Sequence, residues 1–209
     1  MCAVYMLIYI ANVHRIRRNE QQLKKLPGRT FIQRAWHIPH SGEQEKAKRY
    51  LRIEGNLKNR SKFNDFPLEI LLKVGARYMI TDNIDVSDGL VNGTTGTLMH
   101  YEEITDKDDK RVRAKRLWFD FYDLKVGNKK RKEDPSLYRR KLTADGRPIP
   151  PEWTPLDPSE YIAPNSNMNW TIKCMQYYID IAEAITVCKA QGQTCPCAAI
   201  DFGITNPGF

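Results

Sequence analysis

The chain has 209 residues, of which 41% are hydrophobic, and a formal net charge of +8. This length allows one large or two small domains, and the hydrophobic content is sufficient for a buried core. The apolar run at residues 2–11 is too short to span a bilayer and has no basic region before it, so we expect neither a membrane partner nor a secretion signal.

The positive charge is concentrated in one segment. Residues 107–141 contain 14 of the 33 Lys and Arg residues but only 6 of the 25 Asp and Glu residues, so the rest of the chain carries 19 of each. A basic segment on an otherwise neutral body favours a polyanion as partner. A solvated charged loop is the alternative that charge alone leaves open.

The cysteines indicate a reducing, intracellular compartment, since five of them occur without a secretion signal. Cys188 and the nearby pair Cys195 and Cys197 hint at a metal. A tetrahedral zinc site needs a fourth ligand, however, and none of the four histidines has a matching spacing. We therefore expect no metal site.

The first predicted elements are a strand and a helix. Residues 4–10 form a continuous apolar run, which is typical of a central strand in a covered parallel sheet. Asn12 follows at a position where it can cap a helix. Apolar residues then recur at helical spacing until Pro27 and Gly28 end the pattern, namely Val13, Ile16, Leu23 and Leu26.

Residues 29–67 give weaker signals. The run Trp36-His37-Ile38-Pro39-His40 fits a surface loop, a base-stacking site or ordinary packing of a tryptophan. Residues 43–57 are charged and predict a partial helix.

Short strands with glycine corners are predicted next, within residues 71–80 and 89–98. Asn92 and Gly93 predict a hairpin turn between them, because both residue types tolerate positive φ. Further along, Leu117, Phe119 and Phe121 share one face of a predicted strand. Residues 125–132 predict a mobile basic loop, and the prolines of residues 148–158 exclude a regular helix or a central strand there.

The most informative stretch is residues 184–194. Ile185, Thr186 and Val187 are β-branched and predict a short buried strand. Polar residues and a glycine follow it, namely Lys189, Gln191, Gly192, Gln193 and Thr194. At a strand end of an open α/β sheet, such a glycine admits a bound group, the lysine can meet a phosphate and the amides can donate hydrogen bonds. An ordinary polar loop is the alternative.

Residues 184–194 resemble the A-I-T-x-H-K-S-Q-G-Q-T motif of the Pif-type (petite integration frequency) DNA helicases, relatives of RecD, with Cys188 in place of the histidine. Residues 176–183 resemble the preceding Q-F-P-L-x-L-A-x block. Residues 71–83 and 89–98 resemble L-x-L-K-x-G-A-x-V-M-L-x-x-N and G-L-V-N-G-x-x-G-x-V. The opening helix also resembles that of the family, with Arg15 at an apolar position.

The resemblance implies an α/β fold: an incomplete second RecA-like motor domain of the P-loop-NTPase type, with an inserted small Src-homology-three-like β-barrel. Residues 1–68 would form the first part of the motor domain, residues 69–172 the barrel insert with its basic and Pro-rich loops, and residues 173–209 the truncated second part of the motor domain.

The resemblance also implies a 5′-to-3′ helicase that uses ATP and Mg²⁺ to move along single-stranded DNA and to unwind duplexes and junctions. Repair, recombination or telomere maintenance in the nucleus or the mitochondrion would be its setting. The motif that couples ATP to DNA would be Lys189, Gln191, Gly192 and Gln193. The DNA-binding residues would be Asn12, Thr186, Lys73 and Asn92 and, on charge alone, Lys129, Lys130, Arg131 and Lys132.

A helicase needs the phosphate-binding loop G-x-x-x-x-G-K-[ST] and an acidic pair for magnesium, and this sequence has neither. We therefore expect a helicase fragment without its first RecA-like domain, which by itself holds neither ATP nor Mg²⁺ and has no ATPase activity. The alternatives are a noncatalytic nucleic-acid-binding module and a degenerate helicase remnant of a mobile element.

Overall fold

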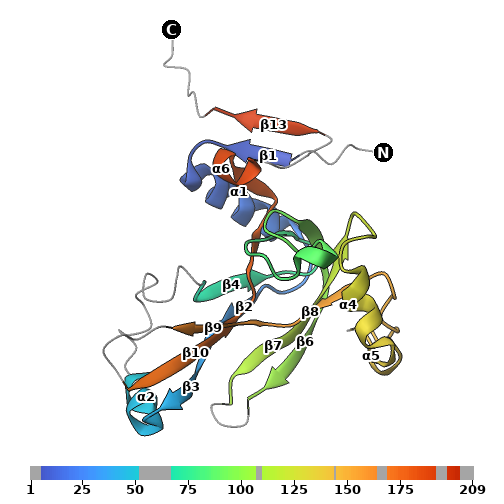
Figure 1. Ribbon diagram of the computed structural model, residues 1–209. Helices are drawn as coiled ribbons and strands as arrows, with labels where there is room; N and C mark the ends of the chain where they lie inside the picture. Colours follow the sequence, from blue (N-terminus) through green and yellow to red (C-terminus); the bar gives the residue numbers. More distant parts are fainter. Residues whose placement is uncertain are drawn as a thin grey trace.

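A small parallel sheet lies at one end of the molecule (Figure 1). The computed structural model describes residues 6–51, 67–106, 110–143, 145–163, 169–191 and 197–202. The sheet has the order β12-β1-β13, with β1 (Met6–Tyr9) between β12 (Ala184–Thr186) and β13 (Ala198–Asp201). The central strand predicted within residues 4–10 is thus confirmed for its described part.

The helix α1 (Asn12–Lys25) packs against β1 and β12. Its buried residues are Asn19 and Leu23, whereas Val13 and Ile16 are 65% and 46% exposed. The helix therefore buries only part of the apolar face that its sequence predicts.

The ends of α1 test two further predictions. The prediction that Asn12 caps the helix is wrong, because Ala11 is the N-cap residue and Asn12 is the first helical residue. The predicted stop at Pro27 and Gly28 is confirmed, since α1 ends at Lys25 and Gly28 has a φ of 81°. A glycine adopts such a positive φ without steric cost.

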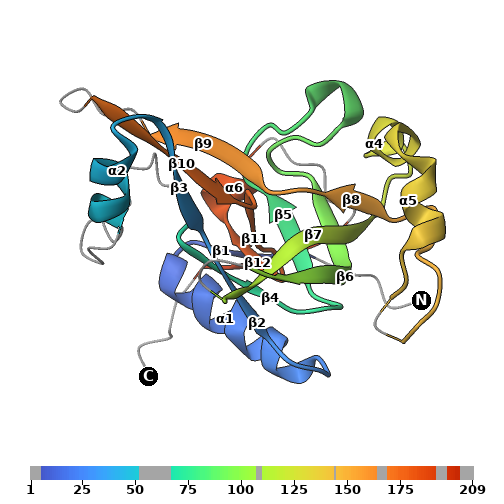
Figure 2. The same cartoon turned by 90° about the horizontal axis from the view of Figure 1, so that it is seen from below.

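A five-stranded antiparallel sheet forms the largest layer (Figures 1 and 2). Its order is β11 (Ile179–Ile181), β5 (Arg77–Ile80), β6 (Thr95–Thr105), β7 (Val112–Phe121) and β8 (Thr154–Leu156). Leu117, Phe119 and Phe121 of β7 lie in the main hydrophobic core, which confirms their predicted common face. Pro155 lies in the edge strand β8, where a missing N–H is tolerated.

Two smaller antiparallel sheets lie beside this one. The order β3-β10-β9 joins β3 (Trp36–Gly42), β10 (Trp170–Gln176) and β9 (Ser159–Ala163), with α2 (Gln44–Leu51) packed on β3 and β10. The second sheet pairs β2 (Phe31–Arg34) with β4 (Glu69–Leu72). The helix predicted within residues 43–57 is therefore present over Gln44–Leu51, and residues 52–57 lie outside the described parts of the chain.

Gln33 connects these sheets from a fully buried position. Its side-chain Oε1 accepts a hydrogen bond from the Ala114 backbone N–H at 2.7 Å. Its backbone carbonyl accepts one from Gln176 Nε2 at 3.2 Å. The strands β2, β7 and β10 are thus joined by side-chain hydrogen bonds in the interior, where such bonds are strong.

Regular structure is present at residues 36–40, where a surface loop was one of the alternatives, and in most of the predicted basic loop. Trp36 to His40 belong to β3, which pairs with β10 across a register shift opposite Pro39. Residues 128–132 of the predicted basic loop belong to the helix α4 (Asn128–Glu133), which is followed by α5 (Pro135–Arg140). Tertiary pairing therefore organises both segments.

The turn at Asn92 and Gly93 is present, but it differs from a two-residue hairpin. Only Gly93 has a positive φ, of 95°, and the Thr94 N–H donates to the Val91 carbonyl at 3.0 Å. The connection between β5 and β6 also contains the short helix η2 (Val86–Asp88).

Several sheets join strands that lie far apart in the sequence. The strands β2 and β3 pair with β4 and β10, and β11 pairs with β5. Of the described helices, none has the length and apolar character needed to cross a membrane.

Candidate functional site

The ends of β1 and β12 lie at one edge of the parallel sheet. Tyr9 is paired with Thr186 in parallel register, so the segments that follow these two strands emerge side by side. The first segment leads into α1, and the second forms α6 (Val187–Ala190). The segment after the first strand and the segment that carries Lys189 therefore share one edge of the sheet.

The residues predicted to couple ATP to DNA begin in a short helix. Lys189 lies in α6, Gln191 follows it, and both are exposed. Thr186 is the N-cap residue of α6 and is partly exposed. Gly192 and Gln193, which the sequence also assigns to this motif, lie outside the described residues.

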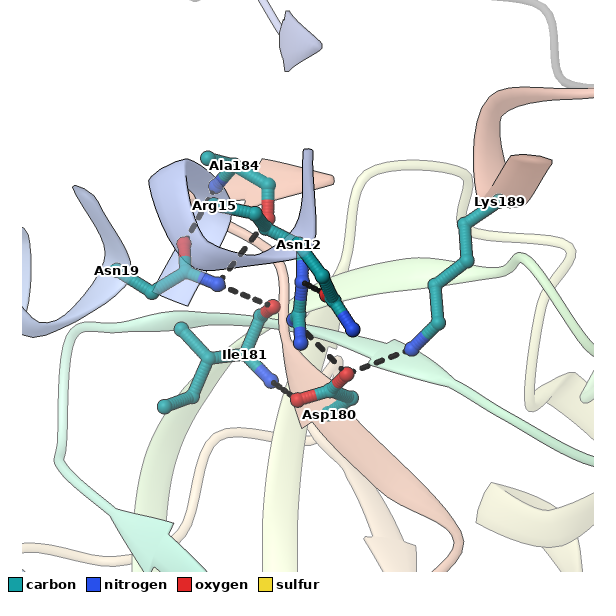
Figure 3. A network of polar contacts seen from close by, with 7 residues as sticks. All are labelled: Asn12, Arg15, Asn19, Asp180, Ile181, Ala184 and Lys189. Carbon is teal, nitrogen blue, oxygen red and sulfur yellow. Dashed lines mark hydrogen bonds and ion pairs between the residues drawn. The ribbon is translucent and has the colours of Figure 1, made fainter. Parts of the chain in front are cut away.

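Asp180 forms ion pairs with two cationic side chains at this edge (Figure 3). Its Oδ2 accepts hydrogen bonds from Arg15 Nη1 of α1 at 3.0 Å and from Lys189 Nζ of α6 at 2.6 Å. Its Oδ1 accepts a third from the Ile181 backbone N–H at 2.9 Å. Asp180 belongs to β11, so one carboxylate joins both parallel-sheet helices to the five-stranded sheet.

Arg15 is in turn positioned by Asn12. The Arg15 Nε donates to Asn12 Oδ1 at 2.8 Å, and the Arg15 side chain is only 12% exposed. A fixed guanidinium of this kind holds the planar geometry that suits carboxylates and phosphates. Asn12 therefore acts on the site through Arg15.

Asn19 holds the backbone beside this network. Its Nδ2 donates to the carbonyls of Ile181 and Ala184, both at 3.1 Å, and its Oδ1 accepts from the Ala184 N–H at 2.7 Å (Figure 3). The side chain is buried, with 3% exposure. One asparagine thus fixes the link between β11 and β12 against α1.

A cavity of about 390 Å³ lies next to Asp180. Its lining combines the network with apolar residues of β4 and β11 and with two further carboxylates; the lining residues are Arg15, Ile16, Asn19, Glu20, Pro67, Glu69, Ile70, Leu71, Tyr78, Thr81, Ile179, Asp180, Ile181 and Lys189. Burial raises the pKa of the Tyr78 hydroxyl, which stays protonated and donates to the Leu71 carbonyl at 2.7 Å.

The structure does not bring the other predicted residues to this edge. Lys73 is buried, with 6% exposure, and its backbone N–H donates to Tyr78 at 2.8 Å, so little of its side chain faces solvent. Asn92 lies in the turn before β6, where its N–H donates to Asn83 Oδ1 at 3.1 Å. The basic residues 129–132 lie in and around α4, which packs on η2 and β8.

The cations of α4 have structural contacts of their own. Lys129 donates to Asp85 at 2.8 Å, and this bond, with those from Ser87, lowers the pKa of Asp85 to about 2. Lys130 pairs with Glu133 at 3.1 Å. The Asp88 carboxylate accepts from the backbone N–H groups of Lys129 and Lys130 at 2.7 and 2.9 Å.

Arg131 makes hydrogen bonds within the fold in the same region, whereas Lys132 is exposed. The Arg131 guanidinium donates to the carbonyls of Val126 and Leu124 and to Thr154 Oγ1. Lys132 is exposed and lines a shallow hollow with Lys125 and Lys129. Much of the basic charge in α4 is therefore used to hold α4 in place.

The sequence did not identify Asp180, Arg15 and Asn19 as parts of the site. A signal existed for Arg15, because a cation at an apolar position of a packed helix needs a carboxylate nearby. Its partner Asp180 lies 165 residues away in the sequence, and the sequence pattern does not connect the two. Within the described residues, no group of three or more His, Cys, Asp or Glu side chains could hold a metal ion.

Comparison with known proteins gives one family-model match and several similar folds. Residues 56–101 match the family model described as "DNA helicase Pif1, 2B domain". In fold, the chain is similar to the Pif1 helicase from Candida albicans, with 17% identity, a TM-score of 0.52 and coverage of 96% of this chain and 39% of that one. It is also similar to unliganded Pif1 from Bacteroides sp., with 16% identity, a TM-score of 0.50 and coverage of 94% of this chain and 46% of that one.

The chain therefore spans less than half the length of either helicase. Among curated proteins, none matches it. The family model agrees with the Pif-type resemblance of the sequence over residues 56–101, and the solved Pif1 helicases share the fold of this chain.

Proposed function

We propose that this Pif1-type helicase segment binds single-stranded DNA and forms the second RecA-like motor domain of an ATP-dependent 5′-to-3′ helicase. The five-stranded sheet and its neighbours would be the small barrel inserted into that domain. A first RecA-like domain would supply the phosphate-binding loop, and ATP and Mg²⁺ would be held between the two motor domains. DNA repair, recombination or telomere maintenance is the proposed setting.

The Asp180 contacts are the observation that carries this proposal. They link α1 and α6, at the edge of the parallel sheet, to β11 of the five-stranded sheet. A motor that moves DNA has to transmit closure of its nucleotide cleft to the strand it holds. An ion network shared by the two sheets provides such a mechanical link, and Lys189 is its cation on the coupling motif.

Phosphate contacts are expected to supply most of the affinity. Lys189 and Gln191 are exposed at the sheet edge, with Thr186 beside them. These groups, together with Gly192 and Gln193, are the proposed contacts to the DNA backbone, and Asn12 acts through Arg15. Binding that depends on phosphates weakens steeply with salt, because condensed counterions are released.

The proposal is tested with the 209-residue chain and a fluorescent oligothymidine, by anisotropy over a salt series. Lys189→Ala should weaken binding about three- to tenfold and reduce the salt slope by about 0.7, the value for one phosphate contact on a single strand. Lys24→Ala, an exposed lysine near the other end of α1, is the charge-matched control and should have a much smaller effect. Equal effects of the two variants would refute the assignment of Lys189.

A second measurement separates this proposal from a noncatalytic binding module. If DNA binding persists after deletion of residues 184–194 and disappears when residues 129–132 are neutralised, the protein is a noncatalytic nucleic-acid-binding module. The isolated chain is also expected to show no ATPase activity. Turnover that Lys189→Ala abolishes would contradict that expectation.

A further inference from the structure

Lys189, the cation proposed to meet a phosphate, is already paired within the protein. Its Nζ lies 2.6 Å from Asp180 Oδ2, the same oxygen that accepts from Arg15 at 3.0 Å. Two cations therefore share one carboxylate, and the charges of these three side chains sum to one positive charge. An anionic phosphate that approaches Lys189 competes with Asp180 for it.

The two cations differ in how readily they can leave. The Arg15 side chain is 12% exposed and is held by Asn12, whereas the Lys189 side chain is 38% exposed. If Lys189 turns away, Asp180 keeps Arg15 and the Ile181 N–H as hydrogen-bond donors. Asp180, whose side chain is 34% exposed, therefore keeps two hydrogen-bond donors when Lys189 leaves, so the desolvation cost is small.

The helix that carries Lys189 is also short. α6 has four residues, and the side chain of its N-cap residue Thr186 makes no capping hydrogen bond. An isolated turn of helix gains little stability from its own hydrogen bonds. The contact between Lys189 and Asp180 thus helps to hold α6 where it is.

We propose that Asp180 is an internal competitor for phosphate: it holds Lys189 in a docked position and lowers the affinity of this edge for a single-stranded DNA backbone. This inference rests on the proposed DNA-binding function. Asp180 is a positioning residue, since it acts through Lys189. The expected consequence is that removal of its charge strengthens binding.

The test compares charge-matched variants of the whole chain in the oligothymidine assay. Asp180→Asn should raise the affinity about two- to fivefold, the range expected for an exposed ion pair, and should steepen the salt slope by up to about 0.7. Asp82→Asn removes the same charge from an exposed residue just after β5 and should leave the affinity nearly unchanged. Asp180→Glu, which keeps the charge, should bind like the unmodified chain.

A double-mutant cycle separates competition from a purely structural role. The gain from Asp180→Asn should disappear in a chain that also carries Lys189→Ala. Thermal unfolding shows whether each variant folds, and Asp180→Ser is the second variant, with the same expected gain, if the asparagine unfolds the chain. A lower melting temperature without a gain in affinity would overturn the inference.

The two proposals fail in different ways. If the unmodified chain does not bind the oligonucleotide, or if Lys189→Ala has no effect, the proposed function fails and this inference fails with it. If the unmodified chain binds through Lys189 and Asp180→Asn binds no more tightly, only the inference fails. A gain that appears with Mg-ATP but not with the oligonucleotide would refute DNA as the competing phosphate.

Discussion

Replacement of Asn19 by alanine should loosen the edge on which the site is built. The side chain is buried and makes three hydrogen bonds, to the carbonyls of Ile181 and Ala184 and from the Ala184 N–H. Alanine makes none of them. The two carbonyls and the N–H would be left without these bonds in the interior.

The size of the effect follows from these three bonds. Each intramolecular hydrogen bond contributes about 1 kcal/mol net, and a buried group left unsatisfied costs about 1–3 kcal/mol. Alanine recovers about 0.6 kcal/mol through its higher helix propensity. We therefore expect Asn19→Ala to lower the free energy of unfolding by about 2–4 kcal/mol. For a chain of this size, that corresponds to a fall in melting temperature of about 5–15 °C.

The assay is urea unfolding combined with hydrogen exchange of the Ala184 amide. That amide should lose protection, because its acceptor is Asn19 Oδ1. The control is Gln21→Ala, an exposed position of α1, which should change the stability by less than about 0.5 kcal/mol. An unchanged unfolding midpoint together with full protection of Ala184 would refute the reasoning.

Two further predictions concern stability elsewhere in the fold. Gly127→Ala should lower the free energy of unfolding in urea by about 1–3 kcal/mol more than Gly146→Ala does. Both glycines have a positive φ (73° and 77°), but of the two only Gly127 has a side chain, that of Thr154, where the new Cβ would lie. Equal losses of stability would contradict the packing argument. Burial lowers the pKa of His37 from 6.5 to about 4. The folded state therefore binds fewer protons than the unfolded state between these values, so stability should fall as the pH drops from about 6.5 to about 4. His37→Gln should flatten the dependence of the free energy of unfolding on pH. Identical pH profiles for the two proteins would contradict the assignment of this dependence to His37.

Arg15 illustrates how sequence reasoning and structure meet at the site. Its charge at an apolar helix position was visible in the sequence, but its consequence was not, because the carboxylate that compensates it lies on β11. The helix turns so that Asn19 and Leu23 are buried and Val13 is exposed. An ion pair that forms across such a distance in sequence leaves no local periodic pattern.

The basic segment likewise shows that counting charges in the sequence does not reveal which charges are paired in the fold. The excess of lysine and arginine lies at residues 107–141 as the sequence shows, yet some of these cations are bound within the fold. Lys129 pairs with Asp85, and Arg131 donates to Val126 and Thr154. The Asp88 carboxylate accepts from the backbone N–H groups of Lys129 and Lys130, 41 and 42 residues away, so part of a segment predicted as a mobile loop is a helix.

By itself, the sequence determined the elements whose causes are local. The apolar run of β1, the stop of α1 at Pro27 and Gly28, and the common face of Leu117, Phe119 and Phe121 follow from side-chain periodicity and from the φ values that a residue tolerates. The motif at residues 184–194 likewise carried the resemblance to the Pif-type helicases. Only the tertiary structure decided which groups meet. Parallel pairing of β1 with β12 brings the ends of two distant strands together, and Asp180 then joins Arg15 to Lys189 because electrostatic attraction depends on distance in space and not on separation along the chain.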